Sequence, residues 1–546
     1  MRNRVIIIFG LLFGLLSCNE TPHHRNVFHY NESKGIASLD PAFAKSQTTI
    51  WPTHQLFNGL VQLDSTLHIK PCIAKQWDID SNRLVYSFHL RQDVFFHTDS
   101  LFKNGTRNVV ASDFVYSFNR LISPQTASPG SWIFGNIDTT KAQHGFEAID
   151  DTTLRIYLKR PFPGFLGLLS MVYCSVVPHE VVDFYKKDFR RHPVGTGPFM
   201  FKLWKEGERL ILVKNPHYFE TDRQGQSLPY LDGIAISFLV DKQSEFLEFL
   251  KGNIDFISGV TANNKDQLLT RQGTLKPIYR NRFTLHKQPY LNTEYLGFQL
   301  DSTAPMYNPI WKNRLIRKAF NLAIDKEKLL KYLRNGMGFP AKQGFIPKGL
   351  PSFSSKWTGF SYNPSEAKRL LSLAGYPNGK GLPPLTLSTT SDYLDICEFI
   401  QHEVEDIGFH LNIDVNTGAA FREMVANGKT AFFRASWIAD YPDAENYLAL
   451  FYSKNFSPEG PNYTHFNDSV YDALYEQALI EPNDNKRQKI YHTLDSIIID
   501  QAAIVPLFYD MVVDFTAKNI IHFETNPLNL LELKTVKMKL SKTKKQ

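Results

Sequence analysis

The sequence predicts a mixed α/β protein with more than one lobe. Residues 154–158 and 409–415 alternate apolar and polar side chains, which is the period-two pattern of half-buried strands. A helix is predicted after Asn363, a capping residue, with Pro364 at its first position and Gly375 just past its end. The length of 546 residues exceeds what one hydrophobic core usually serves, so we expect several lobes.

Two further helices are predicted from their capping residues. Asp325 precedes a helix over residues 326–335, which Gly336 ends. Asp392 is a candidate cap for a helix that Gly408 stops, and the second predicted strand follows at once, as in a helix–strand unit. The apolar face of this helix consists of Ile396, Ile400, Val404 and Ile407.

The N-terminus has the layout of a secretory signal peptide. Arg2 and Arg4 precede an apolar run over residues 5–16, which is shorter than the ~20 residues a membrane-spanning helix needs. Residues 15–18 resemble a bacterial lipobox, which implies that Cys18 is lipidated and becomes the mature N-terminus. We therefore expect a protein of the cell envelope, lipid-anchored on the periplasmic or extracytoplasmic face of a membrane. The alternative is an ordinary signal peptide in which Cys18 has no role.

Composition and charge are those of an exported globular protein. Hydrophobic residues make up 43% and charged residues 21% of the chain. The net charge of +7 includes the arginines of the signal peptide and a lysine-rich C-terminal end, so it indicates no nucleic-acid partner. Beyond Cys18, the cysteines lack the paired spacing of a disulfide framework or a zinc site, so we expect buried free thiols at Cys72, Cys174 and Cys397.

Catalytic and cofactor motifs are mostly absent. His179 and His402 are each followed by Glu but lack the second His of a zinc-protease helix, and residues 195–198 form only half of a dinucleotide loop. Asp150 and Asp151 could serve acid–base chemistry in a glycosidase, but a turn before the strand at 154–158 is the favoured interpretation. We expect no enzyme, no cofactor and no metal site.

The segment 434–443 carries the most informative carboxylate. Asp440 follows an apolar and aromatic run that predicts a buried strand, from Phe432 to Ile438. A buried carboxylate is costly unless a cation or several donors meet it. Arg434 is one possible partner, and a ligand with a positive amine is the other. A plain turn or cap role for Asp440 is the third interpretation.

Ten short motifs follow one another along the chain. Each is weak alone, but together they are collinear between about residue 38 and residue 510. They lie at residues 38–41, 56–60, 71–77, 86–91, 113–120, 193–199, 215–219, 251–255, 317–325 and 367–376. With these motifs the chain resembles the extracellular solute-binding proteins of family 5, the peptide receptors of ABC importers.

This resemblance implies a two-lobed periplasmic-binding-protein-like fold of type II, cluster C. Two crossing segments form the hinge, the first lobe carries an extra domain, and ligand is enclosed between the lobes. The implied parts are a signal peptide at 1–17, a lipidated tether at 18–30, lobe I at 31–60, 176–280 and 505–540, the extra domain at 61–175, lobe II at 281–504 and a basic tail at 541–546.

The resemblance also implies the ligand-binding residues. Asp440 receives the α-ammonium of a peptide, and Trp437 forms a wall of its pocket. Arg434 either pairs with Asp440 or faces the ligand's carboxylate. The peptide backbone would pair with two extended stretches, as an added strand. These stretches are Lys45, Ser46 and Gln47, and Ala435, Ser436, Trp437 and Ile438.

Several positions depart from the family pattern. Close relatives meet a short peptide's carboxylate with cationic side chains where this chain has Asn321, Leu394 and Val425. Some relatives have a disulfide at the positions of Asn292 and Ile438. Gly130 takes the place of an aromatic residue that some relatives point at the start of the ligand. These three departures concern ligand length and the shape of the site.

Three functions follow from these observations. The first is a lipid-anchored, monomeric peptide receptor that passes its ligand to the permease of an ABC importer. The second is a receptor of the same fold for another solute, such as an oligosaccharide, a nickel chelate or haem. The third is a hydrolase acting through Asp150 and Asp151. Asp440 favours the first.

Overall fold

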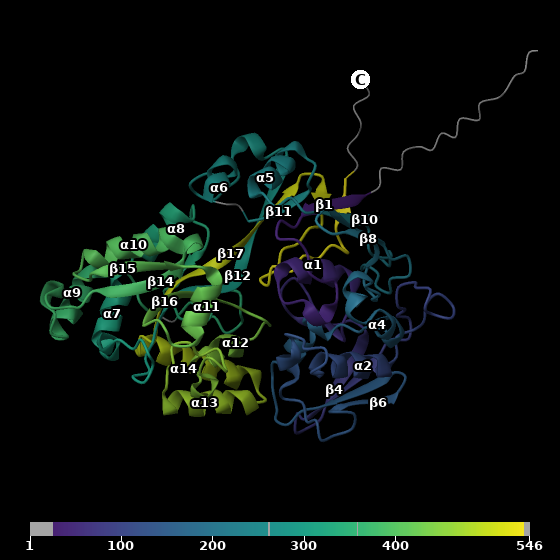
Figure 1. Cartoon of the computed structure of the whole chain (residues 1–546), viewed down its shortest axis with the longest axis horizontal. Coiled ribbons are helices and arrows are strands. Elements are labelled where there is room, and N and C mark those ends of the chain that lie inside the picture. The colour runs from purple at the N-terminus through teal and green to yellow at the C-terminus, as the bar shows by residue number, and fades with distance from the viewer. Residues whose placement is uncertain (1–25, 260–261, 357–358, 540–546) are drawn as a thin grey trace, which may run out of the picture.

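The predicted fold class is confirmed: the protein is mixed α/β, with two lobes joined by two long strands (Figure 1). The computed structural model describes residues 26–259, 262–356 and 359–539. The predicted signal peptide, the lipidated Cys18 and the basic tail lie outside these residues.

Within the described residues, one sheet of eleven strands runs through both lobes. Its order is β15-β14-β16-β12-β17-β11-β1-β10-β9-β8, and β13 pairs with β17. The strands are β1 (Val27–Asn31), β8 (Phe199–Lys205), β9 (Arg209–Lys214), β10 (Gly233–Ser237), β11 (Phe256–Ser258), β12 (Phe283–Phe298), β13 (Phe339–Pro340), β14 (Leu385–Thr390), β15 (Leu411–Asn416), β16 (Phe432–Ile438) and β17 (Ile504–Ala517).

Strands β12 and β17 are the two crossing segments, 16 and 14 residues long. In lobe I, β17 pairs with β11, with Asp514 opposite Ser258. In lobe II, β12 pairs with β16, with Glu294 opposite Ser436. The ladder between β12 and β17 shifts register between Pro289 and Thr293, so a bulge lies between the parts that belong to each lobe.

Lobe I and a four-stranded antiparallel sheet, ordered β4-β5-β7-β6, share one hydrophobic core. Trp51 of lobe I and Phe88 of the small sheet both belong to it. This part of the chain contains β2 (Val61–Leu63), β3 (Ile69–Pro71), β4 (Ala74–Ile79), β5 (Val85–Leu90), β6 (Phe146–Asp150), β7 (Thr153–Tyr157), β18 (Ile520–Ile521), β19 (Lys537–Met538), α1 (Gln47–Leu56), α2 (Ala111–Ile122), α3 (Phe165–Leu169), α4 (His179–Tyr185), α5 (Lys242–Lys251) and α6 (Ala262–Leu268).

Lobe II has separate cores on the two faces of its sheet. Phe298 and Phe432 pack with the helices of one face, whereas Tyr295 and Trp437 pack with those of the other, because successive side chains of a strand point to opposite faces. The helices are α7 (Arg314–Ala323), α8 (Lys326–Leu333), α9 (Pro364–Leu373), α10 (Leu394–Glu405), α11 (Gly418–Ala426), α12 (Glu445–Leu448), α13 (Ser469–Ile480) and α14 (Asp484–Asp500).

Most of the predicted elements form. The strand at 154–158 is β7, and the strand at 409–415 is β15. Asn363 caps α9, and Asp325 caps α8 by accepting from two backbone N–H groups. The prediction that Asp392 caps α10 is wrong, because a short 3₁₀ turn takes up Ser391–Tyr393 and the helix begins after it. The apolar face predicted for that helix is buried.

The predictions about cysteines and the carboxylate pair are confirmed. Cys72, Cys174 and Cys397 are buried free thiols. Asp150 makes the turn between β6 and β7, since its Oδ1 accepts from the backbone N–H of Thr152 at 2.7 Å. Across the described ranges, no helix is long and apolar enough to cross a membrane, and no group of three or more potential metal ligands forms.

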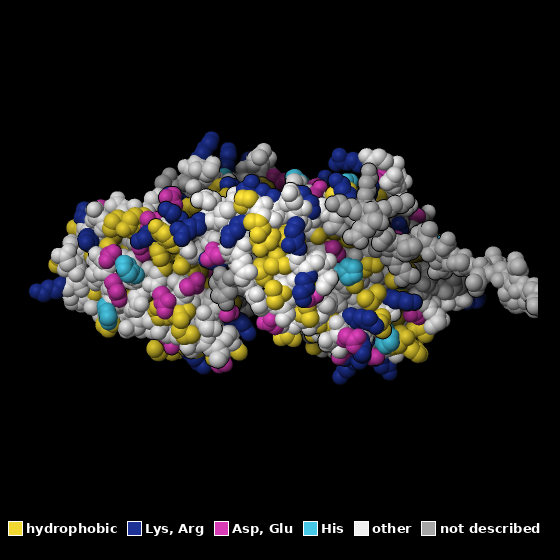
Figure 2. All heavy atoms as spheres, turned by 90° about the horizontal axis from the view of Figure 1, so that it is seen from above, with side chains coloured by type: hydrophobic (Ala, Val, Ile, Leu, Met, Phe, Trp, Pro, Cys, Tyr) yellow, Lys and Arg dark blue, Asp and Glu magenta, His cyan; other side chains and the backbone are white. Residues whose placement is uncertain are grey.

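The face of the molecule that carries α5 and α6 is partly apolar. Figure 2 shows hydrophobic side chains gathered in the middle of this face, with Lys and Arg around them. Val240, Leu247 and Ile278, in and near α5, are exposed. Exposed apolar side chains of this kind are common on the surfaces of soluble proteins.

Candidate functional site

Strand β16 has one paired edge and one open edge. It pairs with β12 over its whole length, whereas β14 meets it only where Ser388 lies opposite Phe433. In the part of the chain that is described, no other strand pairs with residues 435–438 on the open edge. An extended ligand can therefore add to β16 along this edge. These are the residues that the family resemblance assigns to backbone pairing.

The end of β16 is less buried than the sequence predicts. Ile438 is 46% exposed and Trp437 is half-buried, whereas Phe432 and Phe433 are buried. Asn292 lies directly opposite Ile438 in the ladder. The two positions where some relatives have a disulfide are therefore cross-strand neighbours in this protein too.

Asp440 follows β16 at the junction of the two lobes. Ala439 continues the pairing with β12, because its N–H donates to the carbonyl of Leu291 at 2.9 Å. The backbone N–H of Asp440 and the indole N–H of Trp437 both donate to Oδ1 of Asn446, at 3.2 and 2.9 Å. Asn446 is buried on α12. The sequence analysis missed this residue, and no local pattern marks it.

The surroundings of Asp440 disfavour its charge. A large part of the residue stays accessible to water, yet the protein packed around its carboxyl raises the pKa of that carboxyl, and hydrogen bonding to Asn446 only partly opposes the shift. Among the described residues, no Lys, Arg or His forms an ion pair with Asp440. A cationic group bound here would offset the unfavourable environment.

Lobe I supplies the surface that faces Asp440. Burial, with a contribution from the charge of Asp440, raises the pKa of Tyr173 to about 12. The ring of Tyr173 lies against Gly130, where an added Cβ would come within 2.4 Å of it. Tyr441 packs edge-on against Phe162, with ring centroids 6.2 Å apart. Tyr173 is a second residue that the sequence analysis missed.

Arg434 does not pair with Asp440, so that interpretation is wrong. About 20 Å of extended chain separates residues six apart in a strand, which is too far for a direct ion pair. Arg434 instead forms an ion pair with Glu294, and both side chains are buried. Its guanidinium carbon also lies 3.0 Å from the centre of the Tyr393 ring.

The predicted stretch in lobe I is only partly extended. Lys45, Ser46 and Gln47 are exposed, and Ser46 has extended backbone, but Gln47 is the first residue of α1. The N–H of Ser46 donates to Oγ1 of Thr49 at 3.3 Å, and its carbonyl accepts from the N–H of Ile50 at 2.8 Å. The prediction of an extended backbone is wrong at Gln47, since helix capping takes over there.

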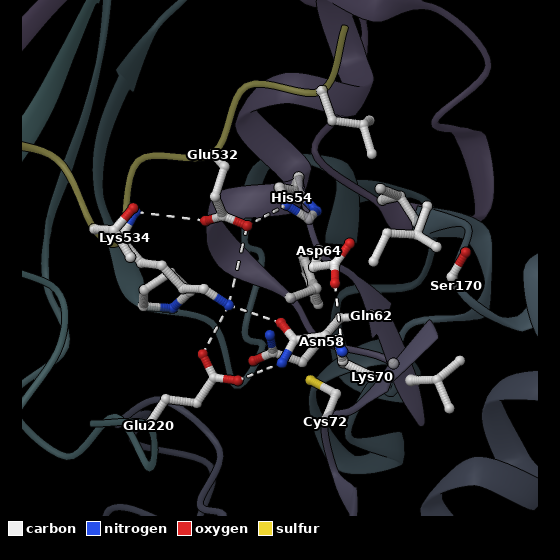
Figure 3. A pocket seen from close by; sticks show the side chains of 18 of the residues that line it. His54, Asn58, Gln62, Asp64, Lys70, Cys72, Ser170, Glu220, Glu532 and Lys534 are labelled. Carbon is white, nitrogen blue, oxygen red and sulfur yellow. Dashed lines mark hydrogen bonds and ion pairs between the residues drawn. The ribbon is translucent and has the colours of Figure 1, made fainter. Parts of the chain in front are cut away.

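A cavity of about 510 Å³ is lined by residues of lobe I and of the small-sheet region, and Asp440 is not among them (Figure 3). Nζ of Lys534 lies 2.7 Å from Oε2 of Glu220, and His54 bonds to Glu532 at 3.2 Å. Burial raises the pKa of Glu532, but the nearby Lys534 and His54 outweigh this effect and lower it to about 2. These charged side chains are paired with one another. Their ion pairs stabilise lobe I and leave none of these charges unpaired for a charged ligand.

Comparison with known proteins decides the family. The model for the bacterial extracellular solute-binding proteins, family 5, middle region, matches residues 68–458. The chain belongs to this family. In this family 5 protein, the cavity lining contains Asn58, Gly59 and Cys72, which lie in two of the motifs that carried the resemblance.

The relatives of this family 5 protein are named for different ligands. Heme-binding protein A of Haemophilus influenzae is 28% identical over 503 residues, with 89% of this chain and 87% of the relative covered. Dipeptide-binding protein DppE of Bacillus subtilis is 24% identical, with 97% of each covered. The structure of the ABC transporter-associated periplasmic binding protein DppA of Helicobacter pylori, in complex with peptide STSA, is 26% identical with a TM-score of 0.75, covering 94% of this chain and 98% of that one.

Proposed function

We propose that this family 5 protein is the substrate-binding lipoprotein of an ABC importer and that it captures peptides between its lobes. Asp440 takes the α-ammonium, Trp437 lines the first side-chain pocket, and the open edge of residues 435–438 pairs with the peptide backbone. Peptide-binding relatives and the peptide complex of a related structure support this proposal.

The observation that carries the proposal is the environment of Asp440. Its carboxyl is accessible to a ligand, its ionised form is disfavoured by its surroundings, and no basic side chain among the described residues pairs with it. A charge-assisted hydrogen bond to an ammonium group is strong in such a place. Removing one partner of such a pair costs about 2–5 kcal/mol.

Calorimetry tests this proposal. Peptides of three to eight residues with free amino termini should bind, and N-acetylation should weaken binding at least 30-fold. Asp440→Asn should do the same, whereas Asp406→Asn, an exposed control in the same lobe, should not. Equal binding of acetylated and free peptides would exclude the ammonium site. Peptides should be recovered uncleaved, since we propose binding without hydrolysis.

The proposal includes lipidation of Cys18 and an extracytoplasmic location. Expression of the full chain in a bacterium, followed by membrane fractionation, tests it. The wild-type protein should sediment with membranes, and Cys18→Ser should release it into the soluble extracytoplasmic fraction. A wild-type protein that stays soluble would contradict the lipid anchor.

A haem receptor is the second candidate, because heme-binding protein A is 28% identical to this chain. Titration with haemin, followed by its visible absorption, separates the two functions. Saturable binding of haemin, together with no binding of any peptide, would favour the haem receptor and contradict the peptide proposal.

A further inference from the structure

The ion pair of Arg434 and Glu294 lies on the strand that leads to Asp440. The two residues come from the adjacent strands β16 and β12, where Arg434 lies opposite Leu296 and Glu294 lies opposite Ser436. They are thus diagonal neighbours on one face of the ladder. Asn292, two residues before Glu294, donates from Nδ2 to Oε1 of Glu294 at 3.2 Å.

This pair sits at the inner end of the candidate ligand path. Residues 434, 436 and 438 share one face of β16, and exposure rises along it from 6% at Arg434 to 46% at Ile438. A peptide held by its amine at Asp440 and running along the open edge would approach Arg434 after about 20 Å.

The charges around the pair are balanced. Glu294 neutralises Arg434, and Arg334 bonds to Asp510 at 2.8 Å. Asn292 links the two pairs, since its Nδ2 also lies 3.4 Å from Oδ2 of Asp510. A ligand carboxylate placed here would add an unpaired negative charge beside Glu294, which is unfavourable in a buried site.

Two buried polar atoms in this cluster lack a hydrogen-bond partner in the part of the chain described. They are Nε of Arg434, a donor, and Oδ1 of Asn292, an acceptor. Both residues are more than nine-tenths buried. Buried donors and acceptors are nearly always satisfied by protein or by water, so these two atoms are free to bond a polar group of a ligand that reaches the cluster along β16. The amides of a peptide offer carbonyl acceptors for the Nε donor and N–H donors for the Oδ1 acceptor, without adding charge.

We infer that the cluster of Asn292, Glu294 and Arg434 is a subsite for a neutral amide of the bound peptide, not for its terminal carboxylate. This inference rests on the proposed peptide function. The protein then binds two kinds of peptide as tightly as it binds peptides with a free C-terminal carboxylate. These are peptides whose chain continues past the cluster and peptides whose C-terminus is uncharged. Glu294 is the residue that sets this preference, because it cancels the charge of Arg434.

Calorimetry with matched peptides, as free acids and C-terminal amides of three to eight residues, tests the inference. For the wild-type protein, acid and amide should bind within threefold of each other at every length. A loss of tenfold or more on amidation at any length would overturn the inference. If no peptide binds in either form, the proposed function itself fails, so the two failures are distinguishable.

A substitution adds a gain-of-preference test. Glu294→Gln keeps the shape of residue 294 but frees the charge of Arg434, so the free acid should now bind at least tenfold more tightly than the amide at one or more lengths. The double variant Glu294→Gln with Arg434→Met is neutral again and should lose that preference. Thermal unfolding shows whether each variant is folded. A folded Glu294→Gln variant without any acid preference would overturn the role of Glu294, and if it does not fold, the wild-type comparison alone decides.

Discussion

Trp437 and Asp440 are held by one atom. The indole N–H of Trp437 and the backbone N–H of Asp440 both donate to Oδ1 of Asn446. The aromatic wall and the carboxylate therefore keep a fixed relative position, although they belong to a strand and to the loop after it. This arrangement makes the site rigid before a ligand arrives, which lowers the entropy lost on binding.

Replacing Asn446 should loosen this arrangement. We expect Asn446→Ala to weaken binding of free-amine peptides about 5- to 30-fold, because one hydrogen-bond acceptor contributes about 1–2 kcal/mol. Calorimetry with one tripeptide and one pentapeptide measures it. The control is Asn104→Ala, an exposed position in the small-sheet region. Unchanged affinity in Asn446→Ala would show that the shared acceptor does not position the site.

The affinity for peptides should depend on pH through Asp440. Its raised pKa means that its carboxyl takes up a proton earlier, as the pH falls, than an ordinary Asp with a pKa of about 3.9. Protonation removes the charge that the ammonium needs, so affinity should decline before the pH reaches that ordinary value. Titrations between pH 7 and pH 4 measure the decline. Constant affinity down to pH 4 would contradict it.

Asp514 should make the protein less stable as the pH rises. It is buried on β17 beside Ser258, its Oδ1 lacks a hydrogen-bond partner among the described residues, and burial raises its pKa to about 7. The folded protein therefore holds a proton that the unfolded chain releases near pH 4, so this group's contribution to stability is full below about pH 4 and is lost between there and about pH 7.

Asp514→Asn should remove this loss. Urea unfolding at pH 5 and pH 8 measures the free energy of unfolding, and at pH 8 the variant should exceed the wild type by on the order of 2 kcal/mol. The difference should be smaller at pH 5. Asp406→Asn serves as the exposed control. A variant that is less stable than the wild type at pH 8 would mean that Asp514 is ionised and paired in the folded protein.

Gly130 should be intolerant of a side chain because of Tyr173. A Cβ at position 130 would lie 2.4 Å from the ring, so Gly130→Ala must displace Tyr173 from its place facing Asp440. We expect a loss of stability of about 1–3 kcal/mol, as for other overpacked sites. In a Tyr173→Ala background the same substitution should be close to neutral. Equal losses in both backgrounds would show that the two residues are not coupled.

Local signals predicted much of the fold. The caps at Asn363 and Asp325 and the alternation of residues 154–158 depend on neighbours within a few positions, so the chain alone reveals them. The prediction for Asp392 was wrong because a three-residue 3₁₀ turn, Ser391–Tyr393, precedes α10, and a capping preference alone does not reveal such a turn.

The contacts of the candidate site depend on distant segments instead. Arg434 finds Glu294 across 140 positions through the register of β12 and β16, and no local pattern encodes that register. Tyr173 lies near Asp440 because lobe I docks against lobe II. Asn446 lies near it because the short helix α12 packs beside the end of β16. Asp440 itself was accessible to sequence reasoning, because its neighbours and the family resemblance both singled it out.

The bulge between Pro289 and Thr293 has a mechanical consequence. Since one continuous sheet extends through both lobes, the lobes cannot swing on slack connectors. Any opening must bend paired backbone, and bending is easiest where the ladder is already interrupted. Pro289 lacks an N–H, and the N–H of Leu291 is given to the carbonyl of Pro527 instead of to β17. We therefore expect motion between the lobes to be concentrated in the few residues of β12 at this bulge. The two ends of the β12–β17 pair, which belong to the sheets of the two lobes, then keep their strand geometry.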